Sequence, residues 1–281
     1  MLPAPVFFTV EKNQRVECIT IFETLAQRET SKMPDKVPVE KIKETAHQSA
    51  RAASAPAPAR RYRAALFQTA LILIASAFAV LTFYVKTMPS FAIDLQITKA
   101  IQLINFPFFA SFMTLVSWPG FGPQLVVITA LIILLIYSFG LHWESVMALV
   151  AASFSSGINL MVKDLIQRPR PTSNLVNVFA KLTDSSFPSG HVMFYIGFYG
   201  FMGFLAFRLL KPSLKRSFLL AFFGGLVVLI GASRIYLGQH WASDVLGAYL
   251  LGSLTLEAYI QIYIWGKTRF FVHQPVVTAK S

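Results

Sequence analysis

The stretch QLVVITALIILLIYSFGL, Gln124–Leu141, contains no charged residue and is long enough to cross the hydrocarbon core of a bilayer as a helix. The chain of 281 residues is 55% hydrophobic and 14% charged, with a mean hydropathy of +0.57, which is too apolar for an ordinary soluble domain. Five further apolar stretches have a comparable length: Ala64–Val85, Val146–Leu165, Val192–Leu210, Ser217–Ala232 and Val245–Trp265. The sequence therefore predicts an all-α membrane protein with a bundle of six transmembrane helices.

A seventh apolar stretch, Ile101–Val116, differs from these six. Pro107 interrupts it, and the charged residues Asp94 and Lys99 precede it. Proline removes a backbone donor and breaks a helix, and nearby charges disfavour a full crossing. We expect an additional interfacial or re-entrant helix here.

The two ends of the chain differ from the apolar part. Residues 1–63 are highly charged and end in a segment rich in Ala, Pro and Arg, which predicts a flexible cytoplasmic tail. Met33 is an alternative start. Residues 64–266 form the predicted membrane domain, and residues 267–281 a short cytoplasmic C-terminal tail. The single cysteine, Cys18, cannot form an internal disulfide and has no metal-ligand spacing.

The net charge of +12 does not indicate nucleic acid, because the basic residues lie in the tails and in short connections rather than on one helix face. Since Lys and Arg resist translocation, they also predict orientation. Three basic groups then lie on the cytoplasmic side of a plasma membrane: Arg60, Arg61 and Arg63; Arg208, Lys211, Lys215 and Arg216; Lys267 and Arg269. The loop 164–190 and the turn 234–240 are expected on the periplasmic or extracellular face.

Three polar clusters gather at that opposite face: Lys163-Asp164-Leu165-Ile166-Gln167-Arg168-Pro169-Arg170-Pro171, then Phe187-Pro188-Ser189-Gly190-His191, then Ser233-Arg234 with His240 and Asp244. Lys163, Arg170 and Arg234 are cations from different helices, and their convergence needs an anion to offset their repulsion. Arginine binds two phosphoryl oxygens at once, so phosphate fits. We interpret Arg168 and Lys181 as charges that solvate helix ends.

The histidines add chemistry to these cations. Pro188-Ser189-Gly190-His191 reads as a tight turn that feeds a helix, where free backbone N–H groups attract phosphate. His240 and Asp244 are four residues apart at a predicted helix start, so their side chains share a face and the carboxylate is able to accept the Nδ1 proton. That leaves Nε2 free to attack phosphorus.

Together these clusters resemble the signature of the type 2 phosphatidic acid phosphatase family, which is similar to bacterial acid phosphatases and vanadium haloperoxidases. Its pattern is Lys, six residues, Arg-Pro; then Pro-Ser-Gly-His; then Ser-Arg, five residues, His, three residues, Asp. Every fixed position is present, in family order, between Lys163 and Asp244. With the helix layout, the resemblance extends over about residues 64–265.

The resemblance implies a double displacement without cofactor or metal. His240 is the nucleophile and forms a phosphohistidine, Asp244 orients it, and His191 is the general acid and base. The phosphate-binding residues would be Lys163, Arg170, Ser189, Gly190 and Arg234. The sequence also offers no zinc spacing, no paired acidic magnesium site and no phosphate-loop motif.

The substrate implied is a membrane lipid phosphate or diphosphate, and phosphatidic acid, phosphatidylglycerol phosphate and undecaprenyl diphosphate fit equally. A phosphotransferase that uses the same histidine, and a non-catalytic phospholipid transporter, stay open as alternatives. A haloperoxidase is disfavoured by the membrane spans. Phe194, Phe198, Phe201 and Phe204 have two candidate roles, shaping a groove for the lipid chain and packing toward lipid, and we expect the second. The oligomeric state is left open.

Overall fold

The computed structural model describes residues 57–88, 90–104 and 106–270, and the regular structure in these ranges is entirely helical. The elements are α3 (Ala57–Thr87), α4 (Ala92–Gln102), α5 (Pro107–Ser117), the 3₁₀ turn η1 (Trp118–Gly120), α6 (Gly122–Ser138), α7 (His142–Ile166), α8 (Gly190–Phe194), the π-helical η2 (Tyr195–Gly200), α9 (Phe201–Leu209), α10 (Leu214–Tyr236) and α11 (Ala242–Phe270). The description below concerns the compact unit Leu66–Ser281. Cys18, Met33 and most of the predicted tail 1–63 lie outside the described residues.

The membrane-spanning character of the helices agrees with the sequence. Within the described residues, five helical segments are long and apolar enough to cross a bilayer: Arg61–Thr87, His142–Ile166, Gly190–Leu209, Leu214–Tyr236 and Ala242–Phe270. A sixth crossing arises only when the pair Pro107–Gly120 and Gly122–Ser138 counts as one span, and this pair is bent by 63°. The all-α prediction is therefore confirmed, while the count of six depends on this bent pair.

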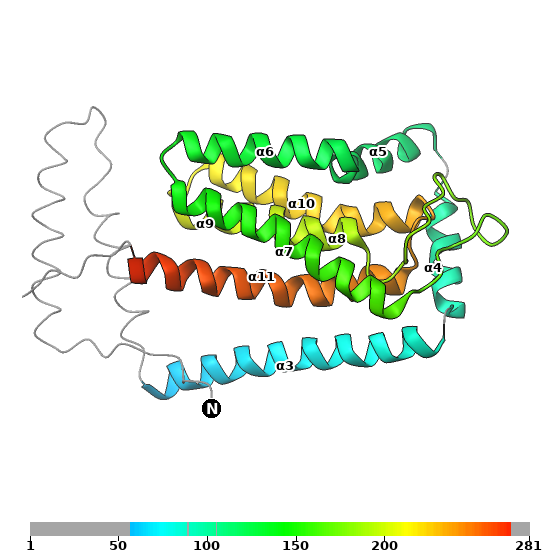
Figure 1. Ribbon diagram of the computed structural model, residues 1–281, viewed down its shortest axis with the longest axis horizontal. Helices are drawn as coiled ribbons and strands as arrows, with labels where there is room; N and C mark the ends of the chain where they lie inside the picture. Colours follow the sequence, from blue (N-terminus) through cyan, green and yellow to red (C-terminus); the bar gives the residue numbers. More distant parts are fainter. Residues whose placement is uncertain (1–56, 89, 105, 271–281) are drawn as a thin grey trace, which may run out of the picture. The chain divides into compact units, whose positions relative to one another are not determined.

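The region of the expected interfacial helix Ile101–Val116 is divided in two. α4 ends at Gln102 and α5 begins at Pro107, because proline is preferred at the first position of a helix and rejected inside one. α5 then runs through η1 into α6, whereas α4 lies across one end of the bundle (Figure 1). The buried residues of α4, Asp94 and Thr98, are polar, and Ile97 and Ile101 pack partly buried against the hydrophobic core, so this helix contacts the bundle through both polar and apolar groups.

The continuous run α8–η2–α9 is the central helix of the bundle. Phe194, Phe198 and Phe201 are at most 2% exposed and pack inside it, so the expectation that these rings face lipid was wrong. The run approaches α7 closely, since a Cβ atom added to Gly197 would lie 1.8 Å from Ser155 Oγ. Such close packing fixes the register of the two helices whose ends carry the first two motifs.

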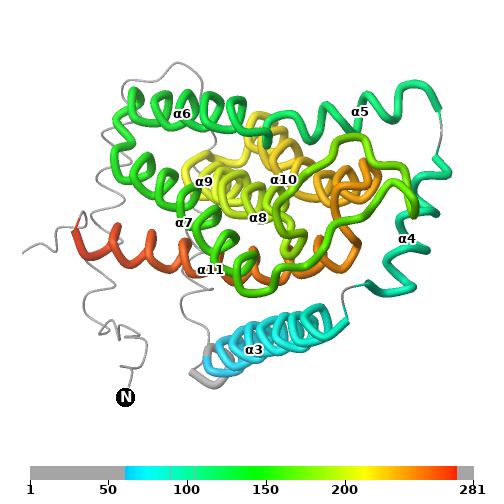
Figure 2. Tube along the Cα trace, turned by 45° about the vertical axis from the view of Figure 1, so that its right-hand side comes forward, coloured from blue at the N-terminus to red at the C-terminus, as the bar shows by residue number. Residues whose placement is uncertain are grey.

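One end of the bundle collects α4, the long loop between α7 and α8, and the turn between α10 and α11 (Figures 1 and 2). α7 stops at Gln167, whose φ of 55° is left-handed, and Pro169 prevents continuation. Lys86 of α3 donates to the carbonyl oxygen of Leu165 at 2.7 Å, which satisfies a free carbonyl at the α7 C-terminus. Several elements at this end of the bundle therefore hold the loop between α7 and α8 in place.

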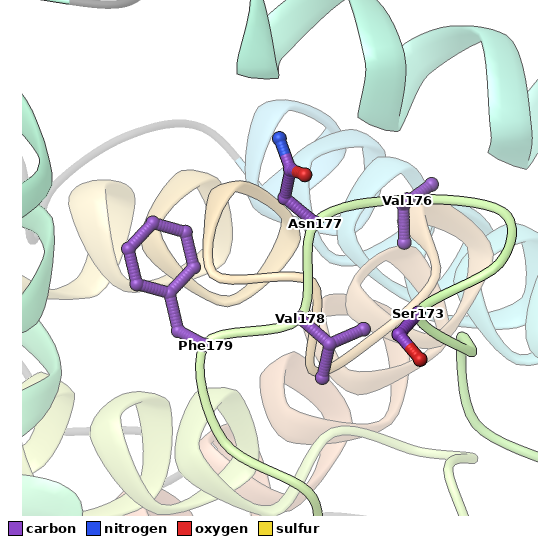
Figure 3. Close-up of a pocket in the computed structure, with 5 residues that line it drawn as sticks. All are labelled: Ser173, Val176, Asn177, Val178 and Phe179. Atoms are coloured by element: carbon purple, nitrogen blue, oxygen red, sulfur yellow. The ribbon is translucent and has the colours of Figure 1, made fainter.

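The loop between α7 and α8 also forms an open depression. Ser173, Val176, Asn177, Val178 and Phe179 line it, and Figure 3 shows that all five come from this one stretch. No residue of the three motifs is among them, so the depression is not the chemical site.

Candidate active site

The eight residues expected to be catalytic or phosphate-binding lie at the loop-bearing end of the bundle, on helix ends or on the segments that connect them. Lys163 is in the last turn of α7, Ser189 occupies the N-cap position of α8, Arg234 is in the last turn of α10, and Asp244 is in the first turn of α11. Arg170 and His240 lie on the connecting segments, and Gly190 and His191 open α8. The fold thus brings together the three clusters that are separated by up to about 80 residues in sequence.

His240 has a defined tautomer. Its Nδ1 lies 2.8 Å from the carbonyl oxygen of Ser186, which only accepts, so Nδ1 carries the proton. Its Nε2 lies 3.2 Å from Nη1 of Arg170, which only donates, so Nε2 carries the lone pair. Two contacts therefore point the unprotonated nitrogen of a buried histidine at a cation.

Asp244 lies on the same side as His240, with its carboxylate 3.6 Å from Nδ1. The Ser186 carbonyl oxygen is the closer acceptor, which the sequence pattern did not reveal. The Asp244 carboxylate instead accepts from Ser186 Oγ at 2.5 Å and from the backbone N–H of Trp241 at 2.8 Å. Ser186 therefore holds both members of the pair.

Arg168 is a further member of this network. Its side chain is 0% exposed and donates to Asp244 at 2.5 Å and to Asp94 of α4 at 2.9 Å. Asp94 also accepts from the backbone N–H and the Oγ of Ser243, at 2.8 and 2.6 Å. The interpretation of Arg168 as a solvated helix-end charge was wrong, because burial demands partners for a guanidinium and two carboxylates supply them. Lys181, in contrast, is exposed.

Lys163 and Arg170 share one carboxylate, that of Asp184 in the α7–α8 loop. Lys163 Nζ contacts Oδ2 of Asp184, and Arg170 Nη2 lies 2.8 Å from Oδ1. The hydrogen bonds and positive charges of these two cations outweigh burial, which by itself would raise the pKa of Asp184, and hold that pKa below its ordinary value. Asp184 is therefore an anion, and no motif had pointed to it.

Arg234 of α10 is fully buried and contacts the α5–α6 bend. Its Nη1 donates to Ser117 Oγ at 3.2 Å, and its guanidinium lies 5.7 Å from the centre of the Phe121 ring. The same ring meets His191 edge-on, with centroids 5.2 Å apart. The segment Trp118–Phe121 therefore contacts both Arg234 and His191.

Several buried polar atoms of the motif region have no partner among the described residues. They are Ser189 Oγ, His191 Nε2, Arg234 Nε, Arg234 Nη2 and Gln239 Oε1. A buried donor or acceptor left unpaired costs free energy, so native sites keep such groups where a ligand satisfies them. Four of these five atoms belong to residues that the motifs had marked as phosphate-binding or catalytic.

The electrostatic setting keeps His240 neutral. Burial, followed by the positive charges of Arg170, Arg234 and Lys163, lowers the pKa of His240 well below its ordinary value. The positive charges of the same three cations repel one another, and within the described residues Asp184 pairs with Lys163 and Arg170 but not with Arg234. The arrangement suits a neutral nitrogen nucleophile next to a site for a negatively charged group.

Within the described residues, no group of three or more His, Cys, Asp or Glu side chains has an arrangement that would hold a metal ion. The carboxylates of Asp94 and Asp244 are both paired with Arg168.

Comparison with known proteins agrees with the motifs. The model of the PAP2 superfamily matches residues 142–267. Phosphatidylglycerophosphatase B of Bacillus subtilis is 29% identical over 181 residues, which are 63% of this chain and 86% of that protein. An undecaprenyl-diphosphatase of Sulfolobus acidocaldarius is 37% identical over 82 residues, which are 29% of this chain and 35% of that protein.

Solved structures give the same result. The transmembrane PAP2-type phosphatidylglycerolphosphate phosphatase of Bacillus subtilis superposes with a TM-score of 0.62 at 27% identity, covering 72% of this chain and 98% of that one. LpxE of Aquifex aeolicus has a TM-score of 0.50 at 22% identity, over 62% of this chain and 98% of that one, a likeness of fold alone. Fold and matches define a multi-pass membrane phosphatase. Residues 142–267, which carry all three motifs, match the model of the PAP2 superfamily, and the chain is similar to the phosphatases named above.

Proposed function

We propose that this protein hydrolyses a membrane lipid phosphate or lipid diphosphate through a phosphohistidine on His240. The observation that carries the proposal is the set of unpaired buried atoms from Ser189, His191 and Arg234, which lie at the same end of the bundle as the turn that carries His240. A phosphoryl group has the negative charge and the acceptor oxygens to satisfy Arg234 and Ser189, and its ester oxygen would satisfy a protonated His191.

The first step would be attack by Nε2 of His240 on phosphorus, with cleavage of the bond from phosphorus to the lipid oxygen. Arg170 gives up its contact with Nε2 and instead binds a phosphoryl oxygen, together with Lys163 and Arg234. The imidazolium that forms keeps its Nδ1 proton and donates it in a hydrogen bond to the Ser186 carbonyl oxygen. The Asp244 carboxylate, 3.6 Å from Nδ1, stabilises the positive charge.

The second residue of the proposed mechanism is His191, at the N-terminus of α8. It would donate a proton to the departing lipid oxygen and then take one from the water that cleaves the phosphohistidine. Ser189 Oγ makes no capping bond to its own helix, so it is available to a phosphoryl oxygen together with the backbone N–H of Gly190. Three protein cations supply the charge that a metal supplies in other phosphatases.

The substrate class is argued from position and from the relatives. The site lies at the ends of apolar helices, so a headgroup would reach it while the acyl or prenyl chain stays in lipid. The named relatives act on phosphatidylglycerophosphate and undecaprenyl diphosphate, and either fits the same side chains.

Orientation is part of the proposal. The basic groups near α3, the α9–α10 link and the end of α11 favour cytoplasmic termini and a periplasmic or extracellular site in a plasma membrane. Single-cysteine variants on a Cys18→Ser background test this. A membrane-impermeant maleimide is expected to label Ser173→Cys in intact cells and Ser213→Cys only after lysis, and the reverse pattern would invert the topology.

The decisive assay is phosphate release by purified protein with EDTA present, on phosphatidic acid, phosphatidylglycerol phosphate and undecaprenyl diphosphate. Release is expected to survive the chelator, to disappear in His240→Ala, and to persist in His142→Ala, an exposed histidine of α7. Radiolabelled phosphoenzyme should accumulate in His191→Ala. No release from any lipid would reject hydrolysis and favour a phosphotransferase or a non-catalytic lipid binder.

A further inference from the structure

Asp184 is the one exposed carboxylate among the ion pairs of the described residues. Its side chain is 55% exposed, whereas its partners Lys163 and Arg170 are 7% and 10% exposed. The other paired acids, Asp94, Asp244 and Glu144, are at most 1% exposed. Asp184 therefore reaches from the surface into a largely buried cationic site.

The two oxygens of this carboxylate are shared between two cations. Oδ2 contacts Lys163 Nζ, and Oδ1 lies 2.8 Å from Arg170 Nη2. The two carboxylate oxygens bridge a lysine and an arginine, and two oxygens of a phosphoryl group would bridge the same side chains in the same way. A carboxylate and a phosphate have the same sign of charge, so both cannot hold these nitrogens at full strength.

The backbone near Asp184 lets the carboxylate leave without disturbing the nucleophile. Two residues later, Ser186 is fixed by a bond from its N–H to the carbonyl oxygen of Arg168 at 2.8 Å, and its own carbonyl oxygen holds His240. Asp184 itself lies in a stretch without regular secondary structure. Its backbone carbonyl oxygen accepts from Arg170 Nε at 2.9 Å, so a rotation of the side chain toward solvent would leave the backbone and the His240 support in place.

We propose that Asp184 is a tethered anion that competes with the substrate phosphate for Lys163 and Arg170, and so weakens the hold of the site on free phosphate. The inference rests on the proposed function, because it takes Lys163 and Arg170 as the phosphate ligands. A lipid substrate offsets the displacement of Asp184 through contacts of its chain, whereas inorganic phosphate has no such contacts. The product would then leave more readily than the substrate.

The test compares orthophosphate binding in the purified protein in lipid nanodiscs, by phosphorus NMR titration or calorimetry. Asp184→Asn is expected to bind orthophosphate at least tenfold more tightly than the parent, and Asp184→Glu within about threefold of it. The matched control is Asp164→Asn, which removes an exposed charge at the end of α7 that forms no ion pair within the described residues. It is expected to bind orthophosphate as the parent does.

Unchanged or weaker orthophosphate binding in a folded Asp184→Asn variant would overturn the inference, since Asp184 would then orient the cations rather than compete for them. Thermal unfolding of each variant checks the fold. The binding measurement does not depend on turnover. If the parent releases no phosphate from lipid while Asp184→Asn still tightens binding, the proposed function fails and the anion site stands. If the parent is active and binding does not tighten, only this inference fails.

Discussion

Arg168 donates to Asp94 at 2.9 Å, although the two residues are 74 positions apart and Asp94 lies outside every motif. The other arm of the same guanidinium lies 2.5 Å from Asp244. A helix that lies across the end of the bundle is thereby linked through one arginine to the carboxylate beside the candidate nucleophile. Neither acid would tolerate burial without this cation.

Removing Arg168 should be strongly destabilising. Arg168→Met leaves Asp94 and Asp244 buried without their cation, and breaking a buried pair in this way costs roughly 3–5 kcal/mol. Thermal unfolding in detergent should show a large decrease in Tm, whereas Lys181→Met at an exposed position should leave Tm within about a degree or two. Adding Asp94→Asn to Arg168→Met should recover part of the loss, and purely additive effects would argue against the pairing.

Gly120 is expected to be essential for the position of His191. A Cβ atom at Gly120 would lie 2.4 Å from Cδ2 and 2.9 Å from Nε2 of that ring. Gly120→Ala should therefore displace the proposed general acid and lower kcat about 10²-fold, within the range of lost acid–base catalysis. Gly157→Ala on α7, where no atom lies within 4 Å, is the control. Equal activity of both variants would show that the His191 ring moves aside without loss.

The neutral state of His240 predicts how stability depends on pH. Its pKa in the folded protein lies well below the ordinary value of about 6.5, so the unfolded state binds more protons near pH 6. The free energy of unfolding should fall as pH decreases through about 6.5 and stop falling below the folded pKa. His240→Gln should lose less stability than the parent between pH 7.5 and 5.5. An identical pH dependence in both would mean that His240 is not held neutral.

Asp244→Asn should be milder here than in serine protease triads, where the corresponding change costs about 10⁴ in kcat through loss of the correct tautomer. The Ser186 carbonyl oxygen holds the Nδ1 proton of His240 without help from Asp244. Arg168 would keep Asp94 as its partner. We expect kcat for lipid phosphate to fall about 10- to 100-fold, and a fall near 10⁴ would show that the carbonyl does not suffice.

The sequence allowed the motif residues and the apolar helices to be predicted, because catalytic residue types at fixed spacing and runs of apolar residues are local signals. Asp184, Ser186 and Asp94 gave no such signal. Ser186 acts through its backbone carbonyl, which every residue carries, and Asp184 and Asp94 are single acids whose partners lie elsewhere in the chain. Their roles follow only from tertiary contacts.

The incorrect interpretations have a common cause. Arg168 was assigned to solvent because arginine beside a helix end usually is exposed, and Phe194, Phe198 and Phe201 were assigned to lipid because a bilayer accepts phenyl rings. In both cases residue type predicts an environment only on average. The central position of α8–η2–α9 buries the phenylalanine rings, and the approach of α4 buries Arg168. Neither arrangement can be predicted from a sequence window of about 20 residues.

The contact of Lys86 with the end of α7 limits how far the chain can be shortened. The superfamily model begins at residue 142, but Lys86 and Asp94, which contact the end of the bundle that carries the motifs, lie upstream of that point. A fragment limited to the recognised region would carry all eleven signature positions and still lack these supports. The smallest active unit of this phosphatase should therefore extend back through α3, and chimeras between relatives should be joined before that helix.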